Sequence, residues 1–207
     1  MIKFGTGGWR AVIGDDFIRE NIAKVAEGVA LLAEKEGKTD KPVMIGYDRR
    51  FLSPEAARWV AEVLCAHGMT VLFQNRSVPT PLVMFTVKDK KLHYGIEVTA
   101  SHNPPAYNGL KLIVEEGRDA DVACTERLEA LIDRVDKPRR MPFEEALAAG
   151  LVVYQHAPFN DFLDSILSRL DVPAIRARNP RILFDPMHGS GTYPLMTVLY
   201  TARCTID

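Results

Sequence analysis

Residues 94–104, with the sequence YGIEV followed directly by TASHNP, carry the strongest local signal in the chain. Residues 94–98 form a short apolar run that predicts a buried strand, and a polar loop begins where this run ends. Functional loops of parallel α/β sheets lie beyond the carboxyl ends of their strands. Two prolines after Ser101 stiffen the loop, which suits a hydroxyl group that must be held in place. The alternative is a turn in which Ser101 and Asn103 bond only to local backbone groups.

On both sides of this loop, the chain alternates between helical and strand patterns. Strands are predicted at residues 43–47, 69–73, 94–98 and 109–114, and helices at about residues 17–37, 53–68, 81–90 and 125–134. Helical segments of this length between strands imply crossover connections and a largely parallel sheet covered on both faces. We therefore expect an α/β fold: a three-layer α/β/α domain with a mostly parallel mixed sheet, followed by part of a second similar domain.

The ends of the first two helices carry recognisable signals. Asp15 or Asp16 is expected to cap the first helix, and Gly37 to end it. The second helix is expected to begin with the hydroxyl cap of Ser53, followed by a proline, and to end at Gly68.

Composition changes at residues 136–142, DKPRRMP, which form the best candidate linker. We predict a first domain over residues 1–136, and a linker with an incomplete second domain over residues 137–207. The second part contains a predicted helix near residues 159–170, a strand at 181–185, a glycine turn and a helix near 193–202. A strand–helix–strand fragment of about 60 residues is marginal as a domain, so we interpret it as interrupted.

Composition excludes several classes of protein. The 207 residues include 26 Lys and Arg against 27 Asp and Glu, so the electrostatic reason to expect nucleic acid or an acidic membrane as partner is missing. No apolar run approaches the roughly 18 residues of a membrane span, and no signal peptide is recognisable at the N-terminus. The cysteines Cys65, Cys124 and Cys204 lack metal-ligand spacing. We expect a soluble cytoplasmic protein that binds neither nucleic acid nor membranes.

Ser101 can act as a nucleophile in two ways. A hydrolase serine needs a base within hydrogen-bond reach, and we expect the adjacent His102 to point elsewhere. The loop also lacks the G-x-S-x-G elbow of many hydrolases. A phosphoryl-transfer serine needs cations, a metal and a polar cradle, and Arg10, His102 and Lys111 can supply the cations.

Three other segments have both a functional and a structural interpretation. Residues 5–10, GTGGWR, can present backbone N–H groups and Arg10 to a phosphate, or form a flexible turn; they match neither a dinucleotide fingerprint nor a P-loop. Asp48 and the two arginines after it suggest an ion-paired strand end. Residues 185–191, DPMHGSG, are typical of an anion-binding turn at a helix start or of a tight structural turn.

Together these segments resemble the α-D-phosphohexomutase superfamily, and within it the phosphoglucomutase/phosphomannomutase group, over essentially the whole chain. The resemblance is carried by FGTGGWR at 4–10, GYDRRFLS at 46–53, VPTP at 78–81, TASHNP at 99–104 with NGLK at 108–111, and DPMHGSG at 185–191. It implies interconversion of hexose 1-phosphate and hexose 6-phosphate, of glucose or mannose, through a phosphoserine and a hexose bisphosphate. Phosphoglucosamine mutase, a serine hydrolase and a non-catalytic sugar-phosphate binding module are the alternatives.

The resemblance also implies roles for particular residues. Ser101 would carry the phosphoryl group and be one ligand of an essential Mg²⁺. Lys111 is the first choice for the general acid/base, with His102 close to the reacting group, and Arg10 would stabilise the transferred charge. Thr6, Gly8 and Asn103, together with Arg10, would bind phosphate or substrate.

The chain departs from the group at two positions and lacks several of its motifs. Gly7 stands where Asp or Ser is frequent, and Arg49 where Thr is common. The metal-binding Asp-Gly-Asp-x-Asp-Arg loop and the sugar- and phosphate-reading loops of domains III and IV do not occur. The resemblance therefore implies that these two domains are missing partners, and that the 207 residues are inactive alone.

Overall fold

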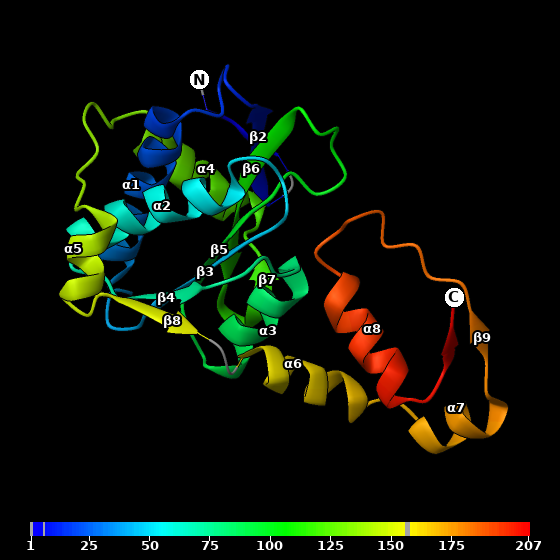
Figure 1. Cartoon of the computed structure of the whole chain (residues 1–207). Coiled ribbons are helices and arrows are strands. Elements are labelled where there is room, and N and C mark those ends of the chain that lie inside the picture. Colours follow the sequence, from blue (N-terminus) through cyan, green and yellow to red (C-terminus); the bar gives the residue numbers. More distant parts are fainter. Residues whose placement is uncertain (1, 6, 156–157) are drawn as a thin grey trace. The chain divides into compact units, whose positions relative to one another are not determined.

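A computed structural model describes residues 2–5, 7–155 and 158–207 of the chain. It divides into two compact units, Met1–Gln155 and His156–Asp207 (Figure 1). Within the described residues, no helix combines the length and the apolar character that crossing a bilayer requires.

The first unit is built on one mixed sheet. Its strands are β1 (Phe4–Gly5), β2 (Gly8–Val12), β3 (Val43–Tyr47), β4 (Val71–Gln74), β5 (Tyr94–Val98), β6 (Tyr107–Val114), β7 (Arg118–Asp119) and β8 (Val152–Gln155). They lie in the order β1-β2-β6-β5-β3-β4-β8, with β7 paired to β6. The strands β5, β3, β4 and β8 are mutually parallel, whereas β6 runs antiparallel to both β5 and β2. The predicted mostly parallel mixed sheet is confirmed.

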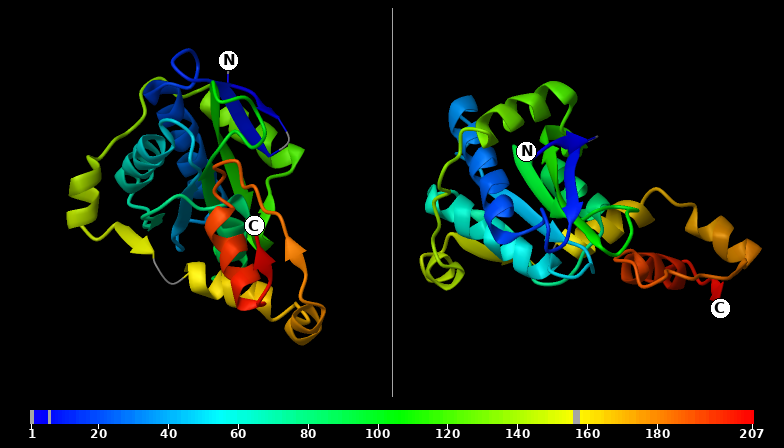
Figure 2. Two further views of the ribbon diagram at one scale, coloured as in Figure 1. Left: turned by 45° about the vertical axis from the view of Figure 1, so that its right-hand side comes forward. Right: turned by 90° about the horizontal axis from the view of Figure 1, so that it is seen from above.

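Helices cover both faces of this sheet, as Figures 1 and 2 show. One face carries α1 (Arg19–Glu36), α2 (Ser53–Ala66) and α4 (Val122–Ile132), with α5 (Phe143–Ala148) beside α2. The opposite face carries α3 (Thr80–Asp89), which packs with the short 3-10 helix Glu115–Gly117. Ile45 of β3 belongs to the apolar core beneath α1, α2 and α4. Its neighbour Gly46 faces Val83 of α3, because successive side chains of a strand point to opposite faces. The predicted three-layer α/β/α arrangement is confirmed.

The helix ends follow the sequence prediction only in part. Gly37 ends α1 in the left-handed conformation, and Gly68 adopts the same conformation just after α2. The predicted N-terminal caps are wrong. Ile18 precedes α1 without a side-chain cap, and Leu52 precedes α2, while the hydroxyl of Ser53 donates to the Asp48 carboxylate.

Residues 137–155 lie with the first unit, whereas the sequence placed them with the linker and the second domain. The helix α5 packs on α2, and β8 extends the sheet by pairing in parallel with β4. The strand β8 lies at the outer edge of β4, and the hydrogen-bonded pairing of the two strands continues to Gln155. The assignment of residues 1–136 and 137–207 to two domains of the family stays a prediction.

The second unit contains α6 (Pro158–Leu167), α7 (Val172–Arg178), β9 (Arg181–Ile182), α8 (Thr192–Thr201) and β10 (Thr205–Ile206). The two short strands pair in parallel, and α6 packs on α8 with the rings of Phe159 and Tyr193 5.0 Å apart. The strand–turn–helix–strand order predicted from the sequence is present, although β9 is shorter than the predicted strand at 181–185.

Gly109 allows β2 and β6 to approach each other closely. A Cβ atom at this position would collide with the carbonyl oxygen of Trp9 and lie 2.8 Å from that of Thr99. Because both neighbours are backbone atoms, one in the paired strand β2 and one in the residue that follows β5, Gly109→Ala is expected to lower the free energy of unfolding by about 1–3 kcal/mol, as overpacking does. Urea unfolding followed by circular dichroism measures this. Gly5→Ala is the control, since its nearest neighbours would be 3.8 Å away, and an equal loss of stability in both variants would contradict the prediction.

Candidate active site

The predicted serine loop lies beyond the carboxyl end of β5, as expected, but it is a hairpin connection. Residues 99–106 join β5 to the antiparallel β6, and the Thr99 amide donates to the carbonyl of Gly109 just past the last paired residues. The parallel strand β3 ends beside β5, with Tyr47 opposite Val98. The residues after β3 therefore meet the serine loop at the carboxyl ends of these two strands.

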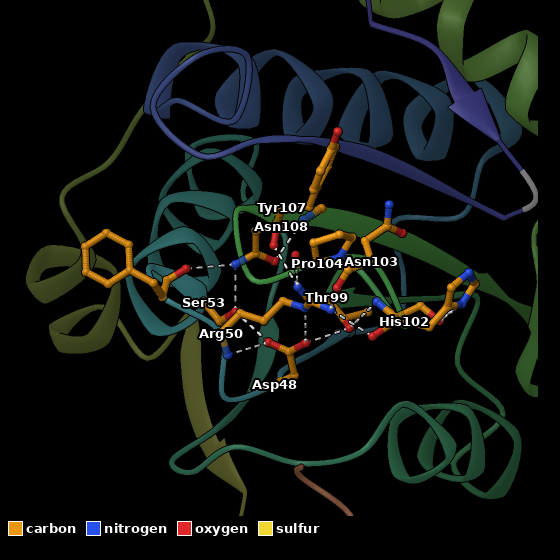
Figure 3. A network of polar contacts seen from close by, with 12 residues as sticks. Asp48, Arg50, Ser53, Thr99, His102, Asn103, Pro104, Tyr107 and Asn108 are labelled. Carbon is orange, nitrogen blue, oxygen red and sulfur yellow. Dashed lines mark hydrogen bonds and ion pairs between the residues drawn. The ribbon is translucent and has the colours of Figure 1, made fainter. Parts of the chain in front are cut away.

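Arg50, which follows β3, holds the serine loop by its backbone. Its Nη1 donates to the carbonyl oxygens of Pro104 and Tyr107, both at 2.9 Å. Its Nη2 donates to those of Ser101 at 2.9 Å and Asn103 at 2.7 Å. Figure 3 shows the Arg50 side chain reaching from the end of β3 into the loop. One guanidinium group thus binds four carbonyl groups of the loop.

Asp48 links Arg50 to the start of the serine loop. Its Oδ2 accepts a hydrogen bond from the Thr99 hydroxyl at 2.7 Å, and lies 3.3 Å from Arg50 Nε. Its Oδ1 accepts hydrogen bonds from the Ser53 hydroxyl at 2.7 Å and from the backbone amide of Arg50 at 2.9 Å. The Thr99 hydroxyl in turn accepts a hydrogen bond from the backbone amide of Ser101 at 3.0 Å. The Asp48 carboxylate is therefore linked to the Ser101 backbone through one hydroxyl group.

Asn108 extends the network into the protein interior. Its side-chain amide donates to the Ser53 hydroxyl at 2.8 Å and to the carbonyl oxygen of Phe51 at 3.0 Å, and both Asn108 and Ser53 are fully buried. Buried side chains with paired polar groups have few alternative positions. We call Asp48, Arg50, Ser53, Thr99 and Asn108 the loop clamp (Figure 3).

Ser101 is exposed and adopts a left-handed backbone conformation, with φ at 58°. This conformation costs a non-glycine residue roughly 1–2 kcal/mol, which the bonds of the loop clamp offset. Its Oγ lies 3.3 Å from Nδ1 of His102, so the expectation that His102 points elsewhere is wrong. The contact is longer than an ordinary hydrogen bond of a hydroxyl, and the described part of the chain places no carboxylate against the other ring nitrogen of His102.

The other predicted residues lie on the strands next to the loop. Lys111 of β6 is opposite Gly8 on one side and Glu97 on the other. Its Nζ lies 2.9 Å from both carboxylate oxygens of Asp119. Arg10 of β2 is opposite Gly109, and its buried Nε has no hydrogen-bond partner among the described atoms.

The binding residues predicted from the resemblance are placed unevenly. Asn103 takes part through its backbone, whose amide donates to Ala100 and whose carbonyl accepts from Arg50. Gly8 lies on β2 beside Lys111. Thr6 lies outside the described residues. The catalytic and binding roles of these residues, and of Ser101, stay predictions.

The sequence pattern does not predict the loop clamp. Asp48 and the following arginines predict an ion-paired strand end, which describes the contact of Asp48 with Arg50 Nε but not the four bonds of Arg50 to the loop. The sequence carries no usable signal for it. Ser53 and Asn108 require partners because they are buried, and their burial is known only from the structure.

The donor atoms of this edge fit a divalent cation only in part. Mg²⁺ prefers a complete octahedron of oxygen ligands. The Asp48 carboxylate is occupied by the loop clamp, and the described residues form no group of three or more metal-ligating side chains. Ser101 is an exposed oxygen donor of the loop. The loop can thus contribute the Ser101 oxygen as a ligand, and a complete set would need ligands from water, substrate or other residues.

The sequence model described as phosphoglucomutase/phosphomannomutase, alpha/beta/alpha domain I, matches residues 1–139. The chain belongs to this family. The resemblance drawn from the sequence motifs is therefore confirmed. A protein named phosphoglucomutase from Staphylococcus saprophyticus is 29% identical over 207 residues, which are 97% of this chain and 37% of that protein. A phosphoglucomutase from Staphylococcus aureus is also 29% identical, over 91% of this chain and 35% of its own length.

Solved structures of family members have the same fold. A putative phosphomannomutase from Thermus thermophilus superposes with a TM-score of 0.87 and 28% identity, over 100% of this chain and 45% of that one. A phosphoglucomutase/phosphomannomutase family protein from Burkholderia thailandensis gives a TM-score of 0.78 at 20% identity, over 100% of this chain and 44% of that one, and shows the fold alone. This phosphohexomutase chain spans less than half the length of the relatives it matches.

Proposed function

We propose that this chain is the N-terminal part of a phosphohexomutase that interconverts hexose 1-phosphate and hexose 6-phosphate of glucose or mannose. The observation that supports this most directly is Ser101, an exposed hydroxyl on a loop whose backbone is bound by Arg50 and Asp48. A side chain fixed through its own backbone can be held in the geometry of a reaction while its hydroxyl stays free to react.

In the proposed reaction, the phosphoryl group on Ser101 passes to a hydroxyl of the sugar phosphate. The bond between phosphorus and Ser101 Oγ breaks, and a new bond to the sugar oxygen forms. Lys111, once its side chain is in the neutral amine form, takes up the proton of the attacking hydroxyl and becomes an ammonium group, and Arg10 stabilises the charge on the transferred group. The bisphosphate then turns around, and its other phosphoryl group returns to Ser101 by the reverse of these steps.

A Mg²⁺ ion, bound to an oxygen on Ser101, would neutralise charge in the transition state. The contribution of this chain is to hold Ser101 through the loop clamp. The remaining metal ligands and the loops that read the sugar would belong to domains III and IV of the family. For this reason the 207 residues alone are proposed to be inactive, and the sugar preference is proposed to be set outside them.

The test is to locate the phosphate. The product of the complete gene, treated with a hexose 1,6-bisphosphate and digested, is expected to carry its phosphate on the peptide containing Ser101 when mapped by mass spectrometry. Ser77 provides an internal control, because its hydroxyl lies at the same end of the sheet and accepts a hydrogen bond from Arg49. Phosphate on Ser77 or on any serine other than Ser101 would refute the proposal.

A serine hydrolase is the second candidate, favoured by the 3.3 Å approach of Ser101 Oγ to His102 Nδ1. A hydrolase also needs a group that orients the histidine, and the described residues place none on the other ring nitrogen of His102. Labelling of Ser101 by a fluorophosphonate would support a hydrolase. We expect no labelling.

A further inference from the structure

Glu97 is a buried acid within the strand that leads to Ser101. It belongs to β5, its exposed fraction is 0%, and neither of its carboxylate oxygens has a hydrogen-bond partner in the described structure. An ionised carboxylate in such a position loses its hydration without compensation, so the protonated, neutral form is favoured. The mechanism proposed above makes no use of this residue.

The carboxyl group of Glu97 occupies space that a glycine leaves open. Gly46 of β3 is directly opposite Glu97, and a Cβ atom on Gly46 would collide with Glu97 Oε2 and with Val83 of α3. The group is therefore enclosed between the sheet and the apolar side chains of α3.

Two charged groups act on Glu97 from the neighbouring strands. Asp48 follows Gly46 by two residues, so both lie on the face that Glu97 occupies. Lys111 is opposite Glu97 on β6, and its ammonium group is paired with Asp119. The charged residues of α3 are Lys88 and Asp89 at its carboxyl end, where Lys88 packs against Gly117 and not against this site.

These surroundings favour the neutral form of Glu97. Burial is the largest cause that raises the pKa of Glu97 well above its usual value; the negative charge of Asp48 raises it further, and Lys111 partly opposes both. Asp48, by contrast, is satisfied by the hydroxyls of Ser53 and Thr99 and by Arg50. Of the two neighbouring carboxyl groups, Glu97 is the one that lacks donors, and it is therefore the one held in its neutral form.

We propose that Glu97 is a positioning residue for Ser101: it carries a proton in the folded protein, and loss of this proton loosens the serine loop. An ionised Glu97 would place a second negative charge beside Asp48, in a site that offers it no donor. Asp48 binds Thr99 and Arg50, and these two residues hold the backbone of Ser101. Repulsion at Asp48 would therefore disturb the two residues that hold the backbone of Ser101, to which the proposed function assigns phosphoryl transfer.

The sign of the pH effect follows from linkage. The closed loop holds the Glu97 proton more tightly than an open or unfolded chain, so loop order is complete at low pH and is lost as pH rises above the usual range of a glutamate. Once the open form has lost its proton while the closed form retains it, the population of the open form rises about tenfold per pH unit.

Amide hydrogen exchange of the chain, corrected for intrinsic rates, tests this between about pH 6 and about pH 9. The probes are the amides of Ser101, Asn103 and Tyr107, which donate to Thr99, Ala100 and Pro104. In the wild type their protection is expected to fall by up to about tenfold per pH unit. In Glu97→Gln and Glu97→Met, which cannot ionise, protection is expected to stay constant.

Glu20→Gln serves as the control, because Glu20 is exposed on the first turn of α1, and it should follow the wild type. The same pH dependence in the wild type and in both Glu97 variants would overturn the proposal. So would a loop that is already loose at pH 6 in both variants, since a neutral side chain would then not be sufficient. The readout involves no catalysis, so it is independent of whether Ser101 transfers phosphate.

Discussion

Replacing Ser101 by alanine is expected to lower hexose-phosphate interconversion by the product of the complete gene by on the order of 10⁴-fold or more. The hydroxyl is the proposed carrier of the phosphoryl group, and a methyl group cannot form the phosphoserine. The loop itself should be retained. Its bonds at this residue use the backbone amide and carbonyl of Ser101, and alanine keeps both. A coupled assay with glucose 1-phosphate measures the loss, and circular dichroism checks the fold.

Ser168→Ala is the control for Ser101→Ala, because Ser168 lies in the second unit and its hydroxyl donates only to a local carbonyl, that of Ser165. It should retain wild-type activity. A Ser101→Ala protein with more than about a hundredth of the wild-type rate would be incompatible with a phosphoserine mechanism at this residue.

The layers of the fold could be predicted because apolar residues determine them locally. The run at 43–47 is apolar along its whole length and the run at 94–98 is apolar except for Glu97, which is close to what a strand buried on both faces requires, and both form strands over those residues. The apolar run at 109–114 does not by itself indicate the direction of β6, but the length of residues 99–106 does. A parallel neighbour needs a crossover of about a dozen residues or more, and this loop is too short for one.

The capping prediction for Ser53 failed because its hydroxyl bonds to distant partners in place of the helix start. A serine before a proline is typical of a helix cap. In the folded chain, the Ser53 hydroxyl donates to Asp48 and accepts from Asn108, which is 55 residues away. No pattern within one helix can indicate such a partner.

The candidate site was predictable where its residues are contiguous and not where they are distant. The polar residues after an apolar strand marked Ser101, His102 and Asn103. The bonds of Arg50 to this loop span 51 to 57 residues, and a single sequence gives no measure of that proximity. Glu97 was missed for a related reason, since one acid in an apolar run does not reveal whether a partner faces it.

Arg50→Met is expected to release the serine loop, and to lower activity in the product of the complete gene by about 10²-fold or more, as a misplacement of about 1 Å can do. Four carbonyl groups lose their donor, and Asp48, whose side chain is 14% exposed, loses its cation. Removing one member of a largely buried ion pair costs about 3–5 kcal/mol. Urea unfolding gives the stability, and hydrogen exchange over residues 99–107 gives the order of the loop.

Two further variants separate the shape of the guanidinium group from its charge. Arg50→Lys keeps the charge, but an ammonium group on a single nitrogen cannot reach four carbonyl oxygens in two directions. We therefore expect it to resemble Arg50→Met in the order of the loop. Arg49→Met changes the same charge one residue earlier, at a side chain that donates to Ser77, and should leave the loop protected. If Arg50→Lys kept the wild-type protection of residues 99–107 against hydrogen exchange, the positive charge alone would hold the loop. The four directed hydrogen bonds would then not be what positions Ser101.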